Sequence, residues 1–335
     1  MRVLIIYNEP VRSPDHPDAA SEREILETAV VVEQHLSQAG CQAVRLGVGR
    51  DPAVLLDGLR RHRPDVVFNL FEGLADHYET EAYLAGLLEW LGVPYTGCPP
   101  QAMTLARNKH LAKQLLKGAG LPTPDFFVVE RLPVPACPLP WPVIIKPARE
   151  DASIGLDQNS VACDQRHLER RVGYLLEQYG PPVLVEQFIP GREFNVGLIE
   201  APELRVLPLA EIEFLVKDES YWPIVTYDAK WKPGTPEYDL TPPRYPADVP
   251  APLAERLRSA AAEAFRLLGC RVYARVDFRV SAAEEIFLLE VNPTPDFSPL
   301  AGLAGGLHAA GISHAEYTVA LARNAAARGR SCPSH

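Results

Sequence analysis

Apolar and polar positions alternate with two different periods along the first hundred residues. Short apolar runs such as 2–8 (RVLIIYN) and 65–71 (DVVFNLF) have the length and content of buried strands. Between such runs, the stretch 20–40 repeats apolar residues every three or four positions and ends at Gly40, which predicts an amphipathic helix. Strands separated by helices of about 10–15 residues predict a doubly wound parallel sheet over residues 1–100.

The pattern changes after residue 100. A basic helix is expected at 108–120, another helix near 165–179, and short apolar strands between them. Near the end, two strands at 271–280 and 285–292 precede a closing helix at 313–329. We therefore expect an α/β protein of three subdomains, which span residues 1–100, 101–190 and 191–330.

Composition and charge narrow the class of protein. The 335 residues are 47% hydrophobic, and the formal net charge is −10, so neither a nucleic-acid nor an anionic-membrane partner is expected. No apolar run is long enough for a membrane helix, and the first one is too short for a signal peptide. Six scattered cysteines without a C-x-x-C pair favour a reducing cytoplasm over a zinc site or disulfide framework.

The strongest chemical signal lies in the last two predicted strands. If the turn between them is centred between Ala283 and Glu284, antiparallel pairing places Asp277 directly opposite Glu290. Period-two alternation then puts Asn292 on the same face as Glu290. Two carboxylates and an amide oxygen at a strand end are ligands that Mg²⁺ accepts. The sequence therefore predicts a metal site here.

A simpler interpretation of the same residues stays open. Glu290 and Asn292 can merely terminate a strand, and Asp277 can pair with Arg275 or Arg279 in its own strand. A register slip of one residue would also move Glu290 to the opposite face of the sheet.

Cations that could bind a nucleotide triphosphate occur at several places. Lys109 begins a helix, Lys230 lies in the segment YDAKW, and Arg275 precedes Asp277 by two residues. Each of these alone is typical of a solvated surface charge. Lys146 differs, because it ends an apolar strand (PVIIK) that is expected to be buried. No phosphate-binding loop of the G-x-x-x-x-G-K-[ST] or G-x-G-x-x-G type occurs in a suitable context, so ATP would bind in another manner.

Six segments resemble one known family in the same order over nearly the whole chain. The segments are NKHLAKQLLKGAGLPTP, PVIIKPAREDASIGL, VLVEQFIPGREFNVG, YDAKW, ARVDF and LLEVNPTP. Together they resemble the D-alanine–D-alanine ligase branch of the ATP-grasp superfamily. The resemblance implies three subdomains, the last two with largely antiparallel sheets that grip ATP between them. It also implies a cytoplasmic enzyme that is commonly a homodimer.

The resemblance also implies roles for individual residues. The ATP-binding residues would be Lys109, Lys146 and Lys230 at the phosphates, Glu186 at the start of the adenine hinge, and Glu193 at the ribose. Asp277, Glu290 and Asn292 would hold two Mg²⁺ ions, with Mn²⁺ as an alternative. The catalytic residues would be Arg275 at the oxyanion, Glu22 at the ammonium of the first amino acid, Ser153 in its support, and Lys230. For Glu22 the alternative is a first-turn carboxylate favoured by the helix dipole.

The activity implied is amide or peptide bond formation between small molecules. A carboxylate would be activated by ATP as an acyl phosphate and then attacked by an amine, with release of ADP and phosphate. Departures from the family gather at the substrate end: Trp231 replaces a tyrosine, Glu72 lies in place of a His-Gly pair, and Asp296 replaces a glycine. Ala301–Gly302 also replaces a Ser-Leu pair that receives a carboxylate.

These departures predict an altered acceptor, such as an amine without a free carboxylate or with a positive charge. For Asp296 the alternative is that it caps a turn after Pro295. Two other functions stay open: a genuine D-alanine–D-alanine ligase of cell-wall synthesis, and a nucleotide-binding protein that has lost catalysis. The intact lysine, arginine and carboxylate positions speak against the last.

Overall fold

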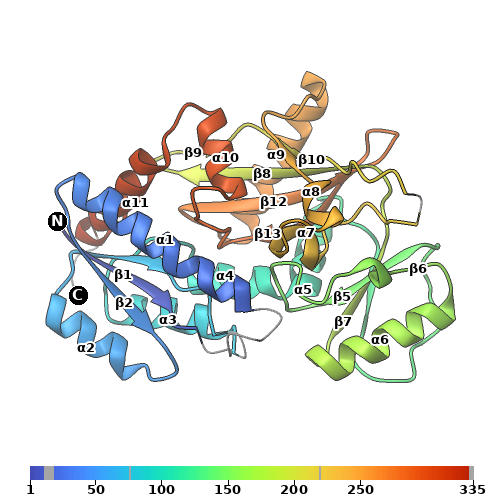
Figure 1. Ribbon diagram of the computed structural model, residues 1–335, viewed down its shortest axis with the longest axis horizontal. Coiled ribbons are helices and arrows are strands. Elements are labelled where there is room, and N and C mark those ends of the chain that lie inside the picture. Colours follow the sequence, from blue (N-terminus) through green and yellow to red (C-terminus); the bar gives the residue numbers. More distant parts are fainter. Residues whose placement is uncertain (11–18, 75–76, 219, 332–335) are drawn as a thin grey trace.

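Three sheets follow one another along the chain (Figure 1). The structure is a computed structural model that describes residues 1–10, 19–74, 77–218 and 220–331, with the backbone alone for residues 19–23, 330 and 331. A three-stranded sheet forms first, then a four-stranded and a six-stranded sheet. The predicted α/β class, with a parallel sheet followed by antiparallel sheets, is confirmed.

The amino-terminal sheet is parallel and covered by helices on both faces. Its strands, in the order β2-β1-β3, are β1 (Arg2–Asn8), β2 (Gln42–Val48) and β3 (Val66–Leu70). Ile5 and Phe68 pack towards the helices α1 (Ala19–Gln38) and α11 (His314–Ser331). Leu4 and Ile6 pack towards α2 (Ala53–His62) and α3 (Thr80–Trp90). Both faces are buried, as expected where crossover helices cover a parallel sheet.

The central sheet has one apolar face and one polar face. Its strands, in the order β4-β7-β5-β6, are β4 (Phe126–Val129), β5 (Val143–Pro147), β6 (Val161–Ala162) and β7 (Val183–Gln187). Helix α6 (Gln165–Tyr179) packs on the apolar face, which includes Ile145 and Val185. Because side chains alternate along a strand, Lys146 and Glu186 lie on the opposite face.

The carboxy-terminal sheet also has one apolar face and one polar face. Its strands are β8 (Arg192–Glu200), β9 (Leu204–Val206), β10 (Ala210–Ile212), β11 (Pro243–Arg244), β12 (Tyr273–Val280) and β13 (Ile286–Asn292). Its apolar face, with Val276 and Phe278 of β12, packs under α4 (Pro100–Arg107), α5 (Lys109–Gly118) and α9 (Ala251–Leu267). Alternation therefore places Arg275, Asp277 and Arg279 on the other face of β12.

Short helices complete the fold: η1 (Gln158–Ser160), α7 (Tyr227–Trp231), α8 (Pro236–Asp239) and α10 (Gly302–Ala309). Helices α4 and α5 precede the central sheet in sequence but pack on the carboxy-terminal one, and α11 returns to the amino-terminal sheet. The subdomain limits at 100 and 190 thus remain a prediction. Within the described residues, every helix is too short or too polar to cross a membrane.

Two histidines meet where α1 packs on α11. The ring centroids of His35 and His314 are 5.3 Å apart, and His314 Nε2 lies 2.9 Å from the carbonyl oxygen of Phe297. Burial lowers the pKa of both imidazoles. A lowered pKa means that the folded state disfavours the charged ring, so this contribution to stability is present above about pH 6.5 and is lost as the pH falls through the folded pKa.

We expect His314→Gln to reduce the loss of stability in acid, because glutamine can still donate to Phe297 but does not gain a charge. The measurement is the thermal unfolding midpoint at pH 7.5 and at pH 5.0. The fall between the two should be smaller in the variant than in the wild type, and His308→Gln, at an exposed position of α10, serves as the control. An equal fall in wild type and His314→Gln would contradict the prediction.

Candidate active site

A cavity of about 850 Å³ lies between the polar faces of the central and carboxy-terminal sheets. Its walls come from β5 and β7 on one side, from β8, β12 and β13 on the other, and from α7 and the loop 149–156. Residues of the amino-terminal region, among them Glu24 and Glu72, line one end. Three parts of the chain that are far apart in sequence therefore share one cavity.

The hairpin of β12 and β13 brings the predicted metal ligands together. Asp277 pairs with Glu290 and Arg275 pairs with Asn292, which is the predicted register. The turn, however, lies between Ser281 and Glu285 and is centred half a residue earlier than predicted. A bulge after Asp277 makes up the difference, because Phe278 pairs with Leu288 and skips one residue of β13.

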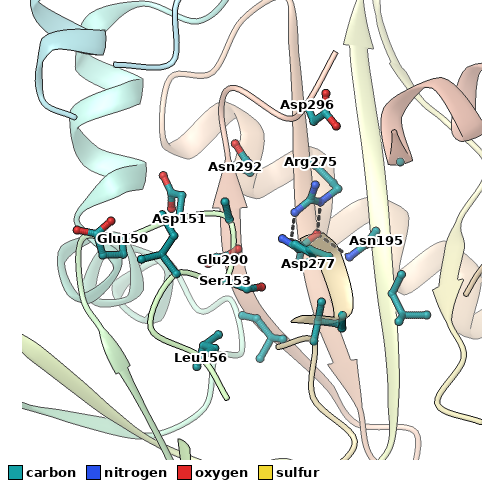
Figure 2. A pocket seen from close by; sticks show the side chains of 18 of the residues that line it. Glu150, Asp151, Ser153, Leu156, Asn195, Arg275, Asp277, Glu290, Asn292 and Asp296 are labelled. Carbon is teal, nitrogen blue, oxygen red and sulfur yellow. Dashed lines mark hydrogen bonds and ion pairs between the residues drawn. The ribbon is translucent and has the colours of Figure 1, made fainter. Parts of the chain in front are cut away.

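Asp277 is also held by an arginine of its own strand (Figure 2). Arg275 donates from Nε and Nη2 to the two carboxylate oxygens at 2.7 and 2.8 Å, and Asn195 donates at 2.8 Å. Asp277 therefore pairs with Arg275, as the alternative interpretation expects, and also lies opposite Glu290, as predicted. Arg279 does not pair with Asp277 but with Glu193. A carboxylate offers about four lone-pair directions, so Asp277 retains acceptor capacity for a cation.

Glu290 lies among positive charges. Its carboxylate is 3.4 Å from Lys109 Nζ. Burial alone would raise the pKa of Glu290, but Lys109, Lys146, Lys230 and Arg275 together lower it to about 2. The negative charge of Glu290 is therefore stabilised opposite Asp277, although opposed carboxylates normally destabilise a sheet.

The donor set suits a hard divalent cation. Asp277, Glu290 and Asn292 offer carboxylate and amide oxygens on adjacent strands, and Mg²⁺ binds through one or two carboxylates with water and phosphate oxygens. Asn292 Oδ1 accepts from the amide of Thr294 at 3.0 Å, which fixes its direction. In the described part of the chain no three His, Cys, Asp or Glu side chains gather as a metal group, so this two-carboxylate set is the candidate.

Glu186 and Lys146 form a buried ion pair facing the cavity. Glu186 is fully buried in β7, and both of its oxygens meet ammonium groups, one of Lys146 and one of Lys113 at 2.5 Å. Burial alone would raise the pKa of Glu186, but the two lysines lower it. Lys146 is thereby held at the cavity edge next to the predicted adenine hinge.

Lys113 is a site residue that the sequence analysis missed. It is 1% exposed, and burial lowers its pKa to about 8 even though Glu186 is adjacent. It donates to Thr123 Oγ1 at 2.9 Å. A signal existed in the sequence, because Lys109 and Lys113 are four positions apart and share a helix face with Ala112 and Leu116. A lysine on the apolar face of a helix predicts a buried partner.

The loop 149–156 is held over the part of the cavity that Lys109 lines. Lys109 Nζ contacts Asp151 at 2.6 Å, and Arg107 contacts the other oxygen at 3.1 Å. Arg107 also pairs at 2.6 Å with the buried Glu81 of α3, so the loop is linked to the amino-terminal region. Ser153 lines the cavity as predicted. Its φ of 61° and the φ of 54° at Ala152 are left-handed, which costs free energy for residues other than glycine.

Trp231 stabilises this strained loop. Its indole Nε1–H donates to the carbonyl oxygen of Ala152 at 3.0 Å, and the amide of Tyr227 donates to Leu156 at 3.0 Å. Tryptophan, unlike the tyrosine that it replaces, cannot accept a hydrogen bond through its side chain. It can donate one, and this indole hydrogen bond attaches α7, with Lys230, to the loop.

We expect Trp231→Phe to raise the KM for ATP by about 3- to 10-fold, since one hydrogen bond of roughly 0.5–1.5 kcal/mol that orders the loop is lost. An ATP titration of phosphate release measures the change. Trp90→Phe is the matched control, because Trp90 is 87% exposed. Equal ATP titrations for the Trp231 variant and the wild type would show that the bond has no influence on the site.

One part of the cavity is acidic. Glu24, Glu72 and Asp296 line it. Burial, followed by the charge of Asp296, raises the pKa of Glu24 and raises that of Glu72 well above its ordinary value. Glu22 belongs to the first turns of α1, but its side chain lies outside the described residues, so the predicted ammonium contact is not tested.

Asp296 also has a local structural role. Its carboxylate accepts from the amide of Ser298 at 2.7 Å and from its hydroxyl at 3.1 Å. The alternative that Asp296 caps a turn after Pro295 is therefore realised, while the same side chain borders the cavity (Figure 2).

Comparison with known proteins identifies the family. The family profile described as D-ala D-ala ligase C-terminus matches residues 115–322, more than half of the chain. The chain therefore belongs to the D-alanine–D-alanine ligase family, as the sequence motifs predict.

Individual relatives are similar to this chain over most of their length. D-alanine–D-alanine ligase of Geotalea uraniireducens is 34% identical over 301 residues, 88% of each chain. The uncharacterized protein y4sG of Sinorhizobium fredii is 36% identical over 234 residues, 70% of this chain and 66% of that protein. A crystal structure of D-alanine–D-alanine ligase from Bacillus anthracis complexed with ATP superposes with a TM-score of 0.78, covering 98% of this chain and 99% of the other at 20% identity. This last likeness concerns the fold.

Proposed function

We propose that this protein is an ATP-dependent carboxylate–amine ligase that forms an amide bond through an acyl phosphate, with an acceptor amine other than D-alanine. The observation that carries the ligase chemistry is the opposed pair Asp277 and Glu290, with Asn292 beside them. Lysines and arginines surround this pair in a cavity large enough for a nucleotide and two small substrates. The family supports the same chemistry.

In the first step an oxygen of the substrate carboxylate attacks the γ-phosphorus of ATP. The bond from this phosphorus to the β,γ-bridging oxygen breaks, which gives an acyl phosphate and ADP. Two anions must approach one another, so catalysis depends on fixed positive charge. Lys109, Lys146 and Lys230 supply that charge around the phosphates, and the loop 149–156 limits access of water.

In the second step a neutral amine attacks the acyl carbon and a tetrahedral oxyanion forms. Arg275 faces this region, and its Nη1 is not engaged by Asp277 or by another described residue. Collapse of the oxyanion breaks the carbon–oxygen bond to the phosphate. The amine proton leaves with the phosphate as hydrogen phosphate, and the amide remains.

Asp277, Glu290 and Asn292 would hold Mg²⁺, in two ions by analogy with the family, or Mn²⁺. The metal would supply charge neutralisation for the transferring phosphoryl group. The residues Glu186 and Glu193 would face the adenine and the ribose of ATP. A homodimer of subunits in the cytoplasm is part of the same proposal.

The acidic end of the cavity supports the altered acceptor. Glu24, Glu72 and Asp296 repel one another, and a cationic group bound there would relieve this repulsion. An acceptor with its own carboxylate would add to it, and Ala301–Gly302 offers no hydroxyl to such a group. We therefore propose an amine acceptor that lacks a free carboxylate or carries a second positive charge.

The relatives support a separate substrate as well. The same strain of Sinorhizobium fredii has a protein named D-alanine–D-alanine ligase, 30% identical to this chain, in addition to y4sG at 36%. Of these two proteins, the one with the higher identity to this chain does not carry the name of a D-alanine–D-alanine ligase, which supports a substrate other than D-alanine.

The test is Mg²⁺-dependent phosphate release from ATP with a panel of D- and L-amino acids, simple amines and diamines, with mass detection of the products. A product from an amine without a carboxylate is expected. A product only from D-alanine, as its dipeptide, would show a genuine D-alanine–D-alanine ligase. No stimulated phosphate release and no product with any pair would show a catalytically silent protein.

Glu72→Gln should lower the preference for a cationic acceptor over a neutral one by about two- to fivefold. The size is modest because the Glu72 side chain, although the cavity walls remove it from bulk water, keeps an exposed surface inside the open cavity. Ion pairs that stay in contact with solvent contribute at most about 1 kcal/mol. The ratio of kcat/KM for two acceptors of equal length measures this preference. Glu79→Gln, on the outer surface near the start of α3, is the control. An unchanged ratio would remove Glu72 from the acceptor site.

A further inference from the structure

Arg279 is a buried arginine that lines the cavity apart from the acidic side chains Glu24, Glu72 and Asp296. Its exposed fraction is 4%, and it lines the cavity together with apolar residues that include Phe188, Ile224 and Leu289. The cations around Glu290 line another part of the same cavity. An apolar recess next to a cation-rich one is the division expected for a nucleotide, with the base in the first and the phosphates in the second.

Arg279 pairs with Glu193 across neighbouring strands. The two residues are directly opposed in the register of β12 and β8, and Arg279 Nε lies 3.1 Å from a Glu193 oxygen. Burial raises the pKa of Glu193, and the charge of Arg279 is the largest influence that opposes this rise. Arg279 thus favours the ionised carboxylate, which accepts hydrogen bonds more strongly than the neutral acid.

Arg279 also connects three segments around the apolar recess. It donates from Nη1 to the carbonyl of Gly191 at 2.9 Å, and from Nη2 to the carbonyl of Pro223. Its guanidinium lies 5.0 Å from the ring of Phe214 and 5.8 Å from the ring of Phe188. With Nε on Glu193, one buried side chain contacts Phe188 of the predicted hinge, the start of β8, and both Phe214 and Pro223. A planar guanidinium can direct separate N–H groups at these three acceptors at once, whereas the single ammonium of a lysine could not.

We propose that Arg279 is a positioning residue that gives this protein its preference for ribonucleotides, by holding the Glu193 carboxylate against the ribose hydroxyls. This inference rests on the proposed function, because it takes the cavity as an ATP site with Glu193 at the ribose. Arg279 acts through Glu193 and the recess and does not take part in phosphoryl transfer.

The experiment compares the binding of Mg²⁺·ATP and Mg²⁺·2′-deoxyATP to the full chain by calorimetry, without acid or amine. The wild type should bind ATP roughly tenfold or more tightly than the deoxy compound, the size of one hydrogen bond to a charged group. Arg279→Met keeps the length of the side chain but removes all its donors. In this variant the affinity for ATP should exceed that for 2′-deoxyATP by less than about threefold. Arg279→Lys keeps the charge but not the planar guanidinium, and its ratio of the two affinities should lie between those of the wild type and Arg279→Met.

A double-variant cycle separates positioning from general damage. Glu193→Gln should lower the ratio by itself, and adding Arg279→Met should not lower it further. Arg192→Met is the matched control: Arg192 also bridges two strands by pairing with Glu211, but it does not line the cavity, so the ratio should not change.

Three results would overturn the inference: no discrimination in the wild type, an unchanged ratio in both Arg279 variants that still bind ATP, or a further fall in the double variant. Each leaves the ligase proposal intact, because ATP binding and product formation are measured separately. Failure of the wild type to bind either nucleotide would instead overturn the proposed function. Should Arg279→Met not fold, the lysine variant and the Glu193→Gln background decide the matter.

Discussion

Glu290→Gln is expected to lower kcat/KM by roughly 10²–10³-fold, the cost of removing one preorganised electrostatic group from a catalytic site. Glutamine keeps the volume and one carbonyl oxygen but removes the negative charge that faces Asp277 across the hairpin. The variant should also need a higher Mg²⁺ concentration for half-maximal phosphate release. A Mg²⁺ titration of substrate-stimulated phosphate release measures both effects.

The control for this prediction lies in the same hairpin. Glu284→Gln makes the same chemical change in the exposed turn and should leave rate and Mg²⁺ requirement as in the wild type. If Glu290→Gln retained its Mg²⁺ requirement and lost less than tenfold in rate, Glu290 would be an anion that neutralises the lysines and not a metal ligand.

Lys146→Met is expected to weaken ATP binding by roughly 10- to 100-fold, since hydrogen bonds to charged groups contribute about 1.5–3 kcal/mol. Lys146 is one of the three lysines that we propose at the phosphates of ATP. Its removal leaves Glu186 with Lys113 as its remaining partner, so the buried carboxylate keeps a counter-charge. ATP binding by calorimetry and kcat from phosphate release should both fall.

Lys117→Met is the comparison for Lys146, because Lys117 is 61% exposed and pairs with Asp125 on the surface of α5. It should bind ATP like the wild type. The assignment of Lys146 to the phosphates would be contradicted if Lys146→Met bound ATP within twofold of the wild type while its unfolding midpoint fell. Such a result would mean that the buried pair with Glu186 serves stability alone.

The alternation of apolar and polar residues was sufficient to predict the strands that contain the predicted metal ligands. Strand β12 alternates Ala274, Val276 and Phe278 with Arg275, Asp277 and Arg279, so the sequence alone separates a core face from a charged face. It also paired Asp277 with Glu290, although the turn was misplaced by half a residue. The predicted pairing of Asp277 with Glu290 is correct because the bulge after Asp277 compensates for the shift of the turn. The sequence pattern does not predict that bulge.

The contacts between distant segments were harder to predict. Arg279 was considered as a partner for Asp277, its neighbour on the same face, but it pairs with Glu193 on the adjacent strand. Lys113 reaches Glu186 of the central sheet from a helix that packs on the other sheet. Trp231 donates to Ala152 across 79 positions of sequence. Such pairs depend on how whole elements dock, and periodicity within one element does not determine docking.

The sequence by itself determined the class of fold, the family and the carboxylate pair of the hairpin, and it singled out the cations that the structure places around Glu290. It could do so because alternation, helix period and motif order are local properties of the chain. Only the tertiary structure decided which cation meets which carboxylate, that the acidic side chains Glu24, Glu72 and Asp296 share one end of the cavity, and that a strained loop is held by Trp231. The physical reason is that the energy of a charge depends on its distance to every other charge and on its burial, and the packing of three sheets sets both.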